Sequence, residues 1–224
     1  MPKILTYKDS KVKLLYATPN PAGVVGLAVA MTMKQDLHDT KPITSKLCKF
    51  LVNAEHTSLL EHVVYTFQLE NYSRSFLAQI TRQRMSSFTS ASQHYQGYSD
   101  YPCVVAPETN ADDLAFLDTA FARAYSTYDY LSDVCAIEEA RQVLPNAAAV
   151  NLLWTINARS LMLFLKHRLC NRNVLEMRIF AHKILNIVQC HFPELFNLAG
   201  PQCVYPGRCQ QGKLQCKEGT WKRV

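Results

Sequence analysis

The alternation of apolar and polar residues between Val63 and Glu70 constrains the fold of this chain more than any other feature. Apolar side chains occupy Val63 and every second position up to Leu69, and Thr66, Gln68 and Glu70 fall between them. A period of two is typical of a β-strand with one face in the core. The pattern therefore predicts a half-buried strand in this part of the chain.

Helical and strand patterns account for most of the remaining chain. Further strands are predicted at residues 11–18 and 150–156, and helices at residues 22–33, 43–54, 73–85, 111–134, 137–144, 157–169 and 174–190. Asn157 is placed to cap the helix after the last strand. The expected fold class is α+β: a single domain over residues 1–200, with a central β-sheet flanked by helices, and an irregular Cys-containing tail over residues 201–224.

Composition favours a globular protein without a membrane span. Of the 224 residues, 48% are apolar, which is enough to build a sizeable core. No apolar run reaches the length of about 18 residues that a transmembrane helix needs. The N-terminus also lacks the basic and then apolar pattern of a signal peptide. We therefore expect a cytoplasmic protein with no membrane partner.

A net charge of +6 favours an anionic ligand without identifying it. Small phosphorylated molecules and nucleic acids both fit such a charge. A nucleic-acid-binding surface would need clustered Lys and Arg with interleaved aromatic residues. Arg82 and Arg84 are too local for that, and Tyr95 and Tyr98 are the nearby aromatic pair. Nucleic acid is therefore the disfavoured partner.

The eight cysteines do not form a recognisable metal motif. They are Cys48, Cys103, Cys135, Cys170, Cys190, Cys203, Cys209 and Cys216. Reduced thiols are the expected state in a chain without an export signal. Because no C-x-x-C pair is present, scattered and mostly buried thiols are favoured over a zinc site. His56 and His62 also lack the helical spacing of metal ligands, so no metal is expected.

A first polar segment is poorly explained by core packing. It runs from Gln79 to Arg84 and continues through residues 86–95, which are rich in hydroxyl groups. Two arginines at a helix end can give forked donors to a phosphate or to flavin carbonyl oxygens. A solvated helix end followed by a polar loop would account for the same residues, so both interpretations stay open at this point.

Two further polar segments are equally ambiguous alone. Asn157 and Arg159 fall at a helix start, where anions are favoured, and Arg168 follows nearly three turns later. A cap with surface arginines is the alternative. The segment His56-Thr57-Ser58, followed by Glu61-His62, is compatible with a ligand contact, a capping serine or a surface loop.

Taken in order, these segments resemble the flavin-dependent thymidylate synthase family. That family's hallmark is Arg-His-Arg, seven residues and then Ser; here Arg82-Gln83-Arg84 is followed at that distance by Ser92, with Tyr95 also in the family's place. The block HTSLLEHVVYTFQLEN is similar to the family's His-x-Ser-x-x-Glu-His segment and the strand after it. The blocks ARQVLP, WTINARSLMLFLKHR and NRNVLEMR are similar to its third region. The resemblance covers about residues 45–200.

The resemblance implies a reaction and its cofactors. Members of the family bind FAD, which NADPH reduces, and 5,10-methylenetetrahydrofolate supplies one carbon. The substrate is a pyrimidine nucleoside monophosphate, dUMP, which becomes dTMP by methylation at C5. No cysteine nucleophile is needed. The family is homotetrameric, with active sites shared between subunits. The resemblance thus implies a methyltransferase and flavoprotein of nucleotide biosynthesis.

The site residues implied by the resemblance follow by position. FAD is expected to contact Ser58, Arg82, Gln83, Arg84, Met85, Asn157, Arg159 and Leu163. The nucleotide is expected to contact Gln79, Arg82, Ser90, Ala91, Ser92, Gln93, His94, Arg141 and Arg168, with much of the 90–94 segment coming from another subunit. Arg168 is the expected catalytic residue, because a permanent cation near the ring carbonyl and N3 stabilises the electron-rich pyrimidine whose C5 attacks. Ser92 is assigned to binding and orientation.

Four positions depart from the family's pattern. The motif histidine is Gln83, which cannot become cationic, and the usual glutamate, arginine and asparagine are Ser90, His94 and Leu163. These changes cluster around the nucleotide and the flavin. Random drift is one explanation, and loss of catalysis is another. An altered substrate is the sharper alternative: a UMP C5-methylase of a nucleoside natural-product pathway, with the same flavin and folate chemistry.

Overall fold

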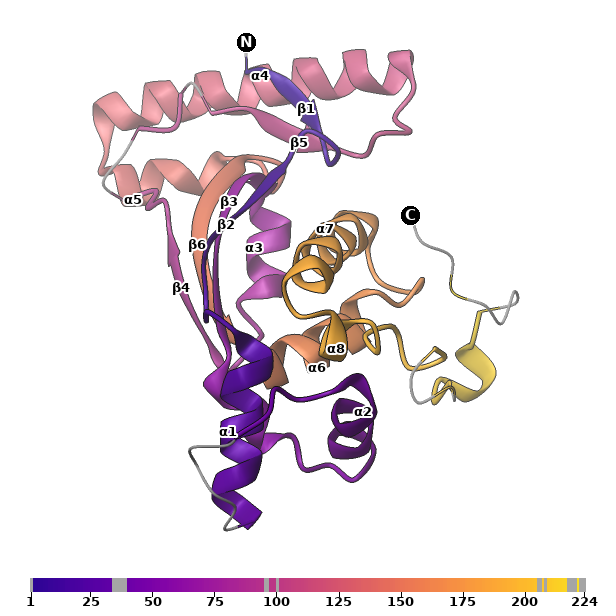
Figure 1. Cartoon of the computed structure of the whole chain (residues 1–224). Coiled ribbons are helices and arrows are strands. Elements are labelled where there is room, and N and C mark those ends of the chain that lie inside the picture. Colours follow the sequence, from indigo (N-terminus) through magenta and orange to yellow (C-terminus); the bar gives the residue numbers. More distant parts are fainter. Residues whose placement is uncertain are drawn as a thin grey trace. The chain divides into compact units, whose positions relative to one another are not determined.

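The computed structural model describes residues 2–33, 40–94, 97–99, 101–204, 207, 209–216 and 221 (Figure 1). Tyr95 lies outside the described residues. The elements in chain order are β1 (Ile4–Thr6), β2 (Lys11–Ala17), α1 (Pro21–Met33), α2 (Ser45–Asn53), η2 (Thr57–His62), β3 (Val64–Ser73), α3 (Arg74–Ile80), β4 (Ser86–Ser90), β5 (Cys103–Val105), α4 (Ala111–Val134), α5 (Ile137–Ala140), η3 (Arg141–Val143), β6 (Ala149–Asn157), α6 (Ala158–Arg168), α7 (Leu175–His191), α8 (Pro193–Phe196) and η4 (Gly212–Leu214), where η marks a 3₁₀ helix.

The described strands form two sheets. A four-stranded sheet has the order β2-β3-β6-β4, and β1 pairs with β5 in a separate parallel ribbon. The alternation that predicted β3 is confirmed, because Tyr65, Phe67 and Leu69 are fully buried and the residues between them are only partly so. Mixed helix and sheet confirm the expected α+β class. No helix in the described part of the chain is long and apolar enough to cross a membrane.

The chain divides into two compact units. Unit 1 comprises Met1–Lys13, Gln68–Arg84 and Phe88–Trp154, and unit 2 comprises Leu14–Phe67, Met85–Ser87 and Thr155–Val224. Each strand of the four-stranded sheet contributes residues to both units. The candidate site residues accordingly fall into two groups, one in each unit.

Unit 1 is organised around α4, which runs alongside β1 and β5 (Figure 1). Its Phe121 and Tyr125 pack with Cys103 and Val105 of β5 in one buried cluster. The helix begins at the predicted residue because the Asn110 side chain accepts a hydrogen bond from the Asp113 backbone N–H and so caps it. A second cluster joins Tyr98, Tyr128 and Ala140. This packing fixes the segment after β4 against α4.

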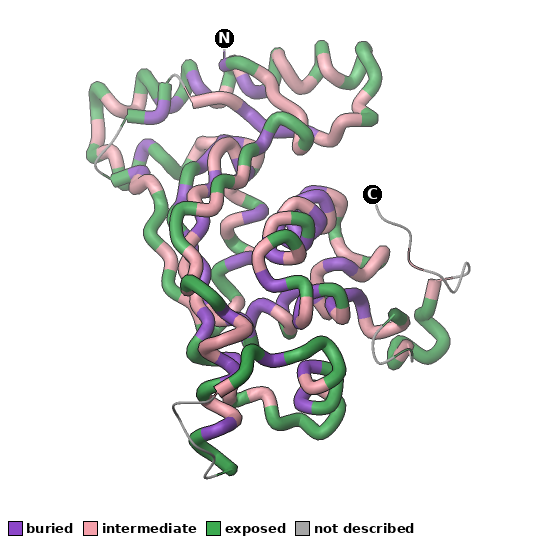
Figure 2. Tube along the Cα trace, viewed as in Figure 1, coloured by how far each residue is buried: buried purple, intermediate pink, exposed green. Residues whose placement is uncertain are grey.

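Unit 2 has its core around α7, whose buried positions recur along the helix (Figure 2). Helix α6 contacts α7 and η2, and α2 contacts α8. Within this unit the hydroxyls of Thr66 and Thr155 lie 3.0 Å apart across β3 and β6. The first backbone N–H of α6, on Ala158, donates to the Val63 carbonyl at 2.7 Å. The start of α6 is therefore attached directly to the chain just before β3.

The predicted helix over residues 73–85 is too long. Helix α3 ends at Ile80, because the Thr81 hydroxyl donates to the Leu77 carbonyl and the Gln83 N–H turns back to the Ile80 carbonyl. Arg82 and Arg84 thus lie beyond the helix and do not end it. The polar residues 86–90, for which a polar loop was one of the open interpretations, form strand β4.

Two shorter expectations are also wrong. The helix predicted over residues 137–144 is α5 only as far as Ala140, followed by the 3₁₀ turn η3. The predicted loop at residues 56–58 already belongs to a 3₁₀ helix from Thr57 onward. Strands β1 and β5 were not predicted, since each has only three residues and their pairing is set by tertiary contacts.

Candidate functional site

A cavity of about 740 Å³ lies in unit 2 beside α6. We call it the Arg159 cavity. Its walls come from α2, η2, α6 and the chain after α8, and they consist of Val52, Asn53, Glu55, Thr57, Leu60, Glu61, Met85, Arg159, Ser160, Met162, Leu163, Lys166, Leu198, Ala199 and Gly200. Apolar walls with a few polar groups are typical of a small-molecule or cofactor site.

The first turn of α6 positions the charged group of this cavity. The Asn157 side chain caps the helix by accepting from the Ser160 N–H at 2.8 Å, which confirms its predicted capping role. Arg159 then lies in the first turn, and its guanidinium donates to the Glu61 carboxylate at 2.5 Å. Both side chains stay about half exposed. A guanidinium has five N–H donors, so Arg159 keeps donors for a ligand while Glu61 orients it.

The residues expected to contact FAD are only partly gathered here. Met85, Arg159 and Leu163 line the Arg159 cavity. Asn157 lies at the capping position beneath it, and Ser58 is an exposed neighbour of the lining residue Thr57. The other three, Arg82, Gln83 and Arg84, belong to unit 1. Unit 2 therefore contains those expected FAD contacts that lie in or next to the Arg159 cavity.

In unit 1, part of the expected nucleotide set converges on Glu138. The His94 Nδ1 atom lies 3.2 Å from the Glu138 carboxylate, and the Arg141 Nε–H donates to the Glu138 carbonyl at 3.1 Å. Helix α5 and turn η3 thus hold Arg141 next to the residue that fixes His94. A guanidinium and an imidazole thus lie beside the polar segment, and the guanidinium can donate to an anion.

The polar segment itself is anchored to the sheet and to α4. The Ala91 N–H donates to the Asn151 carbonyl at 3.0 Å, and the Tyr98 hydroxyl reaches the Ala91 carbonyl at 3.5 Å. Burial is the main cause that raises the pKa of Tyr98, so this phenol stays neutral. The Ser92 hydroxyl accepts from the His94 N–H at 3.1 Å. The segment is therefore ordered by local bonds before any ligand arrives.

The other members of the nucleotide set are less gathered. Gln93 is buried, whereas Ser90 is exposed at the end of β4. Gln79 is half-buried near the end of α3, and Arg82 is exposed just after that helix. Arg84 is likewise exposed. Arg82 and Arg84 can therefore reach a ligand from the chain between α3 and β4.

Arg168 is the last residue of α6 and is half-buried. Lys166 and His167 precede it in the last turn, where the helix dipole favours cations. Partial burial, with the charges of Lys166 and Arg168, lowers the pKa of His167. The imidazole is therefore neutral near pH 7, while the guanidinium keeps its charge. This is the permanent cation that the expected role of Arg168 demands.

Reasoning from the sequence missed three residues of these sites. Glu61 was named only as part of an ambiguous polar segment, yet it orients Arg159. Glu138 stands three residues before Arg141, a spacing that brings the two together within one helical turn. Lys166 lines the Arg159 cavity and was treated only as part of a helix. Lys166 follows Met162 by one helical turn and Arg159 by two, and this spacing was the signal available in the sequence.

The fold and the hallmark segments agree with one family of known proteins. The chain belongs to the family described as thymidylate synthase complementing protein, whose model matches residues 13–194. A flavin-dependent thymidylate synthase of Clostridium tetani is 34% identical, with 96% of each chain covered. Another, of Geobacter sulfurreducens, is 33% identical over 96% of this chain and 97% of the relative.

Solved structures agree on the fold. The chain is similar to the UMP/dUMP methylase PolB from Streptomyces cacaoi bound with 5-Br dUMP, with a TM-score of 0.76, 23% identity and coverage of 87% of this chain and 95% of that one. The same enzyme bound with 5-Br UMP gives a TM-score of 0.73, 21% identity and coverage of 92% and 97%. The family match and the relatives confirm the resemblance based on the three sequence blocks and the methyltransferase class, and the solved structures confirm the fold class.

Proposed function

We propose that this chain converts dUMP to dTMP with FAD, NADPH and 5,10-methylenetetrahydrofolate. The observation that carries the proposal is the Arg159 cavity, where Met85, Arg159 and Leu163, three positions expected against FAD, line one space. Met85 is far in sequence from Arg159 and Leu163, which share helix α6. Their convergence is what a cofactor site of this family requires.

The cavity also has the chemistry of a flavin site. Leu60, Met162 and Leu198 offer apolar walls to an aromatic ring system, and Arg159 offers forked donors to an oxygen or a phosphate. Glu61 holds that guanidinium in place. When bound, FAD reduced by NADPH supplies the hydride that turns the folate's one-carbon unit into a methyl group.

The chain's own residues bind and orient the nucleotide. Arg141 and Arg82 provide donors for the phosphate, and Ser92 and Gln93 orient the nucleotide through neutral hydrogen bonds. Arg168 stabilises the negative charge that develops on the pyrimidine carbonyl as C5 attacks. His94, paired with Glu138, stands where the family has an arginine. We assign it to the nucleotide side of the site, with Gln79, Ser90 and Ala91.

The assembly belongs to the same proposal. The expected nucleotide residues of unit 1 are anchored within their own unit, and those expected against FAD lie largely in unit 2. A homotetramer with shared active sites would allow residues 90–94 of one subunit to serve another. The single domain over residues 1–200 and the separate tail remain predictions of the same kind.

An absorbance spectrum and a substrate assay test this proposal. The purified protein should be yellow, with a flavin spectrum, and should elute as a tetramer. With NADPH and the folate it should form dTMP from dUMP. A colourless protein that takes up no FAD when it is offered would overturn the assignment.

A UMP methylase is the second candidate, and the substitutions at Gln83, Ser90, His94 and Leu163 favour it. Assaying UMP and dUMP side by side separates the two candidates, since a preference for UMP would reverse our choice. The Gln83→His variant restores the family's residue. If Gln83 arose by drift, dUMP turnover should stay level or rise. A collapse of turnover would indicate a site specialised around the neutral amide.

A further inference from the structure

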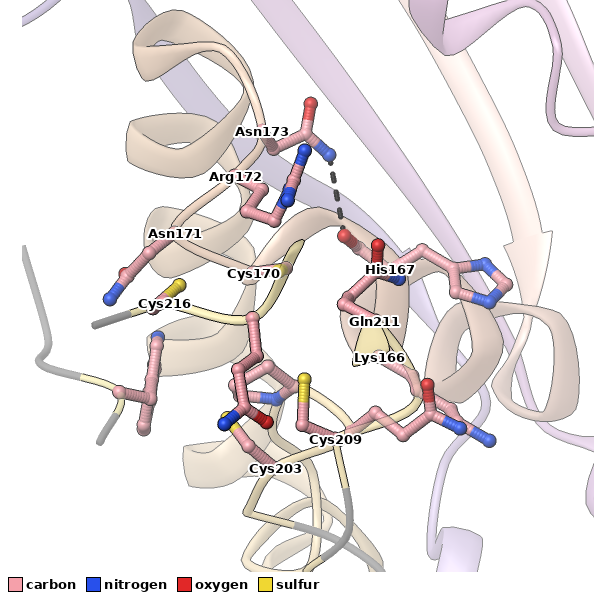
Figure 3. A pocket seen from close by; sticks show the side chains of 14 residues that line it. Lys166, His167, Cys170, Asn171, Arg172, Asn173, Cys203, Cys209, Gln211 and Cys216 are labelled. Atoms are coloured by element: carbon pink, nitrogen blue, oxygen red, sulfur yellow. Dashed lines mark hydrogen bonds between the residues drawn. The ribbon is translucent and has the colours of Figure 1, made fainter. Parts of the chain in front are cut away.

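Four cysteines that are dispersed in the sequence line one cavity in unit 2. Cys170 follows α6, and Cys203, Cys209 and Cys216 come from the tail. Figure 3 shows their side chains around this space, which has a volume of about 380 Å³. We call it the cysteine cavity. The other four cysteines are not among its lining residues, so the gathering is selective.

The four thiols line the same space. All four are half-buried and none forms a disulfide. In a reducing compartment, a group of four thiols is more typical of a metal site than of a disulfide framework.

The described part of the tail that carries three of these cysteines is largely exposed or half-buried. Among the described residues after Gly200, only Pro201 is buried. The Arg172 guanidinium donates to the Leu214 carbonyl, and the Trp221 ring stacks on His182 with centroids 5.3 Å apart. Ordering so exposed a segment costs conformational entropy. A ligand that joined the thiols would offset part of that cost.

The cavity also has the charge that a thiolate-bound cation needs. One Zn²⁺ ion bound by four thiolates is a doubly negative centre, and its formation releases the four thiol protons. Lys166 and Arg172 line the same cavity and provide N–H donors and positive charge beside the sulfurs. Donors of this kind orient and stabilise ligating atoms.

We propose that Cys170, Cys203, Cys209 and Cys216 bind a structural zinc ion that ties the tail to the end of α6. This departs from the expectation that the cysteines are merely scattered. It also gives the tail a purpose, because Cys170 stands two residues after Arg168 and the ion would fix that turn. Structural zinc ions prefer four ligands in a tetrahedral arrangement, and cysteine sulfur is one of the ligands they favour.

The thiols must move closer together when the ion binds. Within the described part of the chain, no three Cys, His, Asp or Glu side chains are already placed to hold a metal. The tail can make this movement: Gly207 and Gly212 flank Cys209, have positive φ angles and have no atoms near the place of a Cβ. Closing of the ligands around the metal is the usual behaviour of small zinc sites.

Metal content is the direct test. We expect about one zinc per chain in protein purified with reductant and zinc, and less than about a tenth of that in Cys203→Ser or Cys209→Ser, because a structural site needs all four ligands. Cys190→Ser, which removes an exposed thiol of α7, is the matched control and should keep the zinc. Zinc that is absent from the wild-type protein, or that persists in the ligand variants, would overturn the proposal, as would iron in its place.

Two measurements on the wild-type chain avoid any dependence on how the variants fold. Zinc should slow alkylation of these four cysteines relative to Cys190, as read by mass spectrometry of peptides. Cobalt(II) should give the visible bands of a tetrahedral thiolate complex, at wavelengths beyond flavin absorption. Equal alkylation with and without zinc, or disulfides joining the four residues in reduced protein, would contradict the site. Neither readout depends on methylation, so failure here leaves the proposed activity untouched.

Discussion

The two cavities beside α6 in unit 2 are built in opposite ways. The Arg159 cavity is framed by α2, η2 and α6, and a capped helix start and an ion pair define its polar groups. The cysteine cavity is framed by the turn after α6 and by a tail with little regular structure. Lys166 lines both cavities. One site is thus formed by packing, and the other calls for a ligand to complete it.

Local sequence signals reveal one of these two kinds of site and not the other. The Arg159 cavity rests on local signals: an Asn at a cap, an Arg two residues later, and a strand pattern just upstream. The cysteine cavity depends on Cys170 meeting residues more than thirty positions further along the chain. No local spacing records that encounter, since loop closure over such a distance is set by the rest of the fold.

The largest effect should come from the last residue of α6. Arg168→Lys should keep FAD but lower kcat by about 10²–10³-fold, because an ammonium cannot reproduce the planar donor fork at the developing charge. Steady-state dTMP formation and the flavin spectrum measure the two quantities separately. Arg123→Lys, an exposed change on α4, is the control. Near-normal turnover in Arg168→Lys would remove Arg168 from its assigned role.

A smaller effect is expected in the Arg159 cavity. Arg159→Ala should weaken FAD binding by about 10- to 100-fold, as the loss of charge-assisted hydrogen bonds implies. Glu61→Gln keeps the guanidinium but loosens its orientation, so it should weaken binding less. Titration of the apo-protein with FAD measures both, and the double variant should behave like Arg159→Ala alone. If all three variants bound FAD as tightly as the wild-type protein, FAD would not use this ion pair.

Removing the metal should then distinguish the cavities. A chelator should release zinc and expose the tail to trypsin near Lys213, because the described part of the tail is largely exposed or half-buried. FAD should remain bound, since packed helices and not the ion hold the Arg159 cavity. Limited proteolysis and the flavin spectrum follow both events in one sample. If FAD is lost at the rate of zinc release, the two cavities form a single cooperative site.

The same contrast explains what could be predicted of the fold. The bounds of α4 and the alternation of β3 follow from local apolar periodicity, and both agree with the structure. Strand β4 was missed because it is a short edge strand, although Phe88 stacking on Trp154 marks its inward side. The end of α3 was missed because a side-chain hydroxyl, from Thr81, takes a helix carbonyl. Side-chain bonds of this kind compete with helix propensity and leave no periodic trace.

For the candidate site, the sequence predicted which residues matter but not which side chains pair with them. Asn157 and Arg159 were singled out by their place at a helix start, and the structure puts them there. Their partner Glu61 lies in another element, and the pairing of His94 with Glu138 likewise joins separate segments. A single sequence carries no signal for such contacts unless the residues are neighbours on one helix.

The smallest predicted effect concerns backbone strain, which also differs between the two cavities. Helix α2 ends in a Schellman motif, in which the His56 N–H donates to the Leu51 carbonyl and the Glu55 N–H to the Val52 carbonyl. Glu55, at the edge of the Arg159 cavity, therefore has a φ of 59°, whereas the tail uses glycine at such angles. The left-handed conformation costs a side-chain-bearing residue about 1–2 kcal/mol, and glycine's extra unfolded freedom offsets about 0.5–1 kcal/mol of that.

Glu55→Gly should accordingly stabilise the protein by less than about 1 kcal/mol. The midpoint of denaturant unfolding measures this, with an unchanged slope as the sign that only stability has moved. Gly207→Ala makes the opposite change in the tail, where φ is 93°, and should weaken zinc retention without affecting FAD. A lower midpoint in Glu55→Gly would mean that the Glu55 side chain contributes more to the Arg159 cavity than its backbone costs.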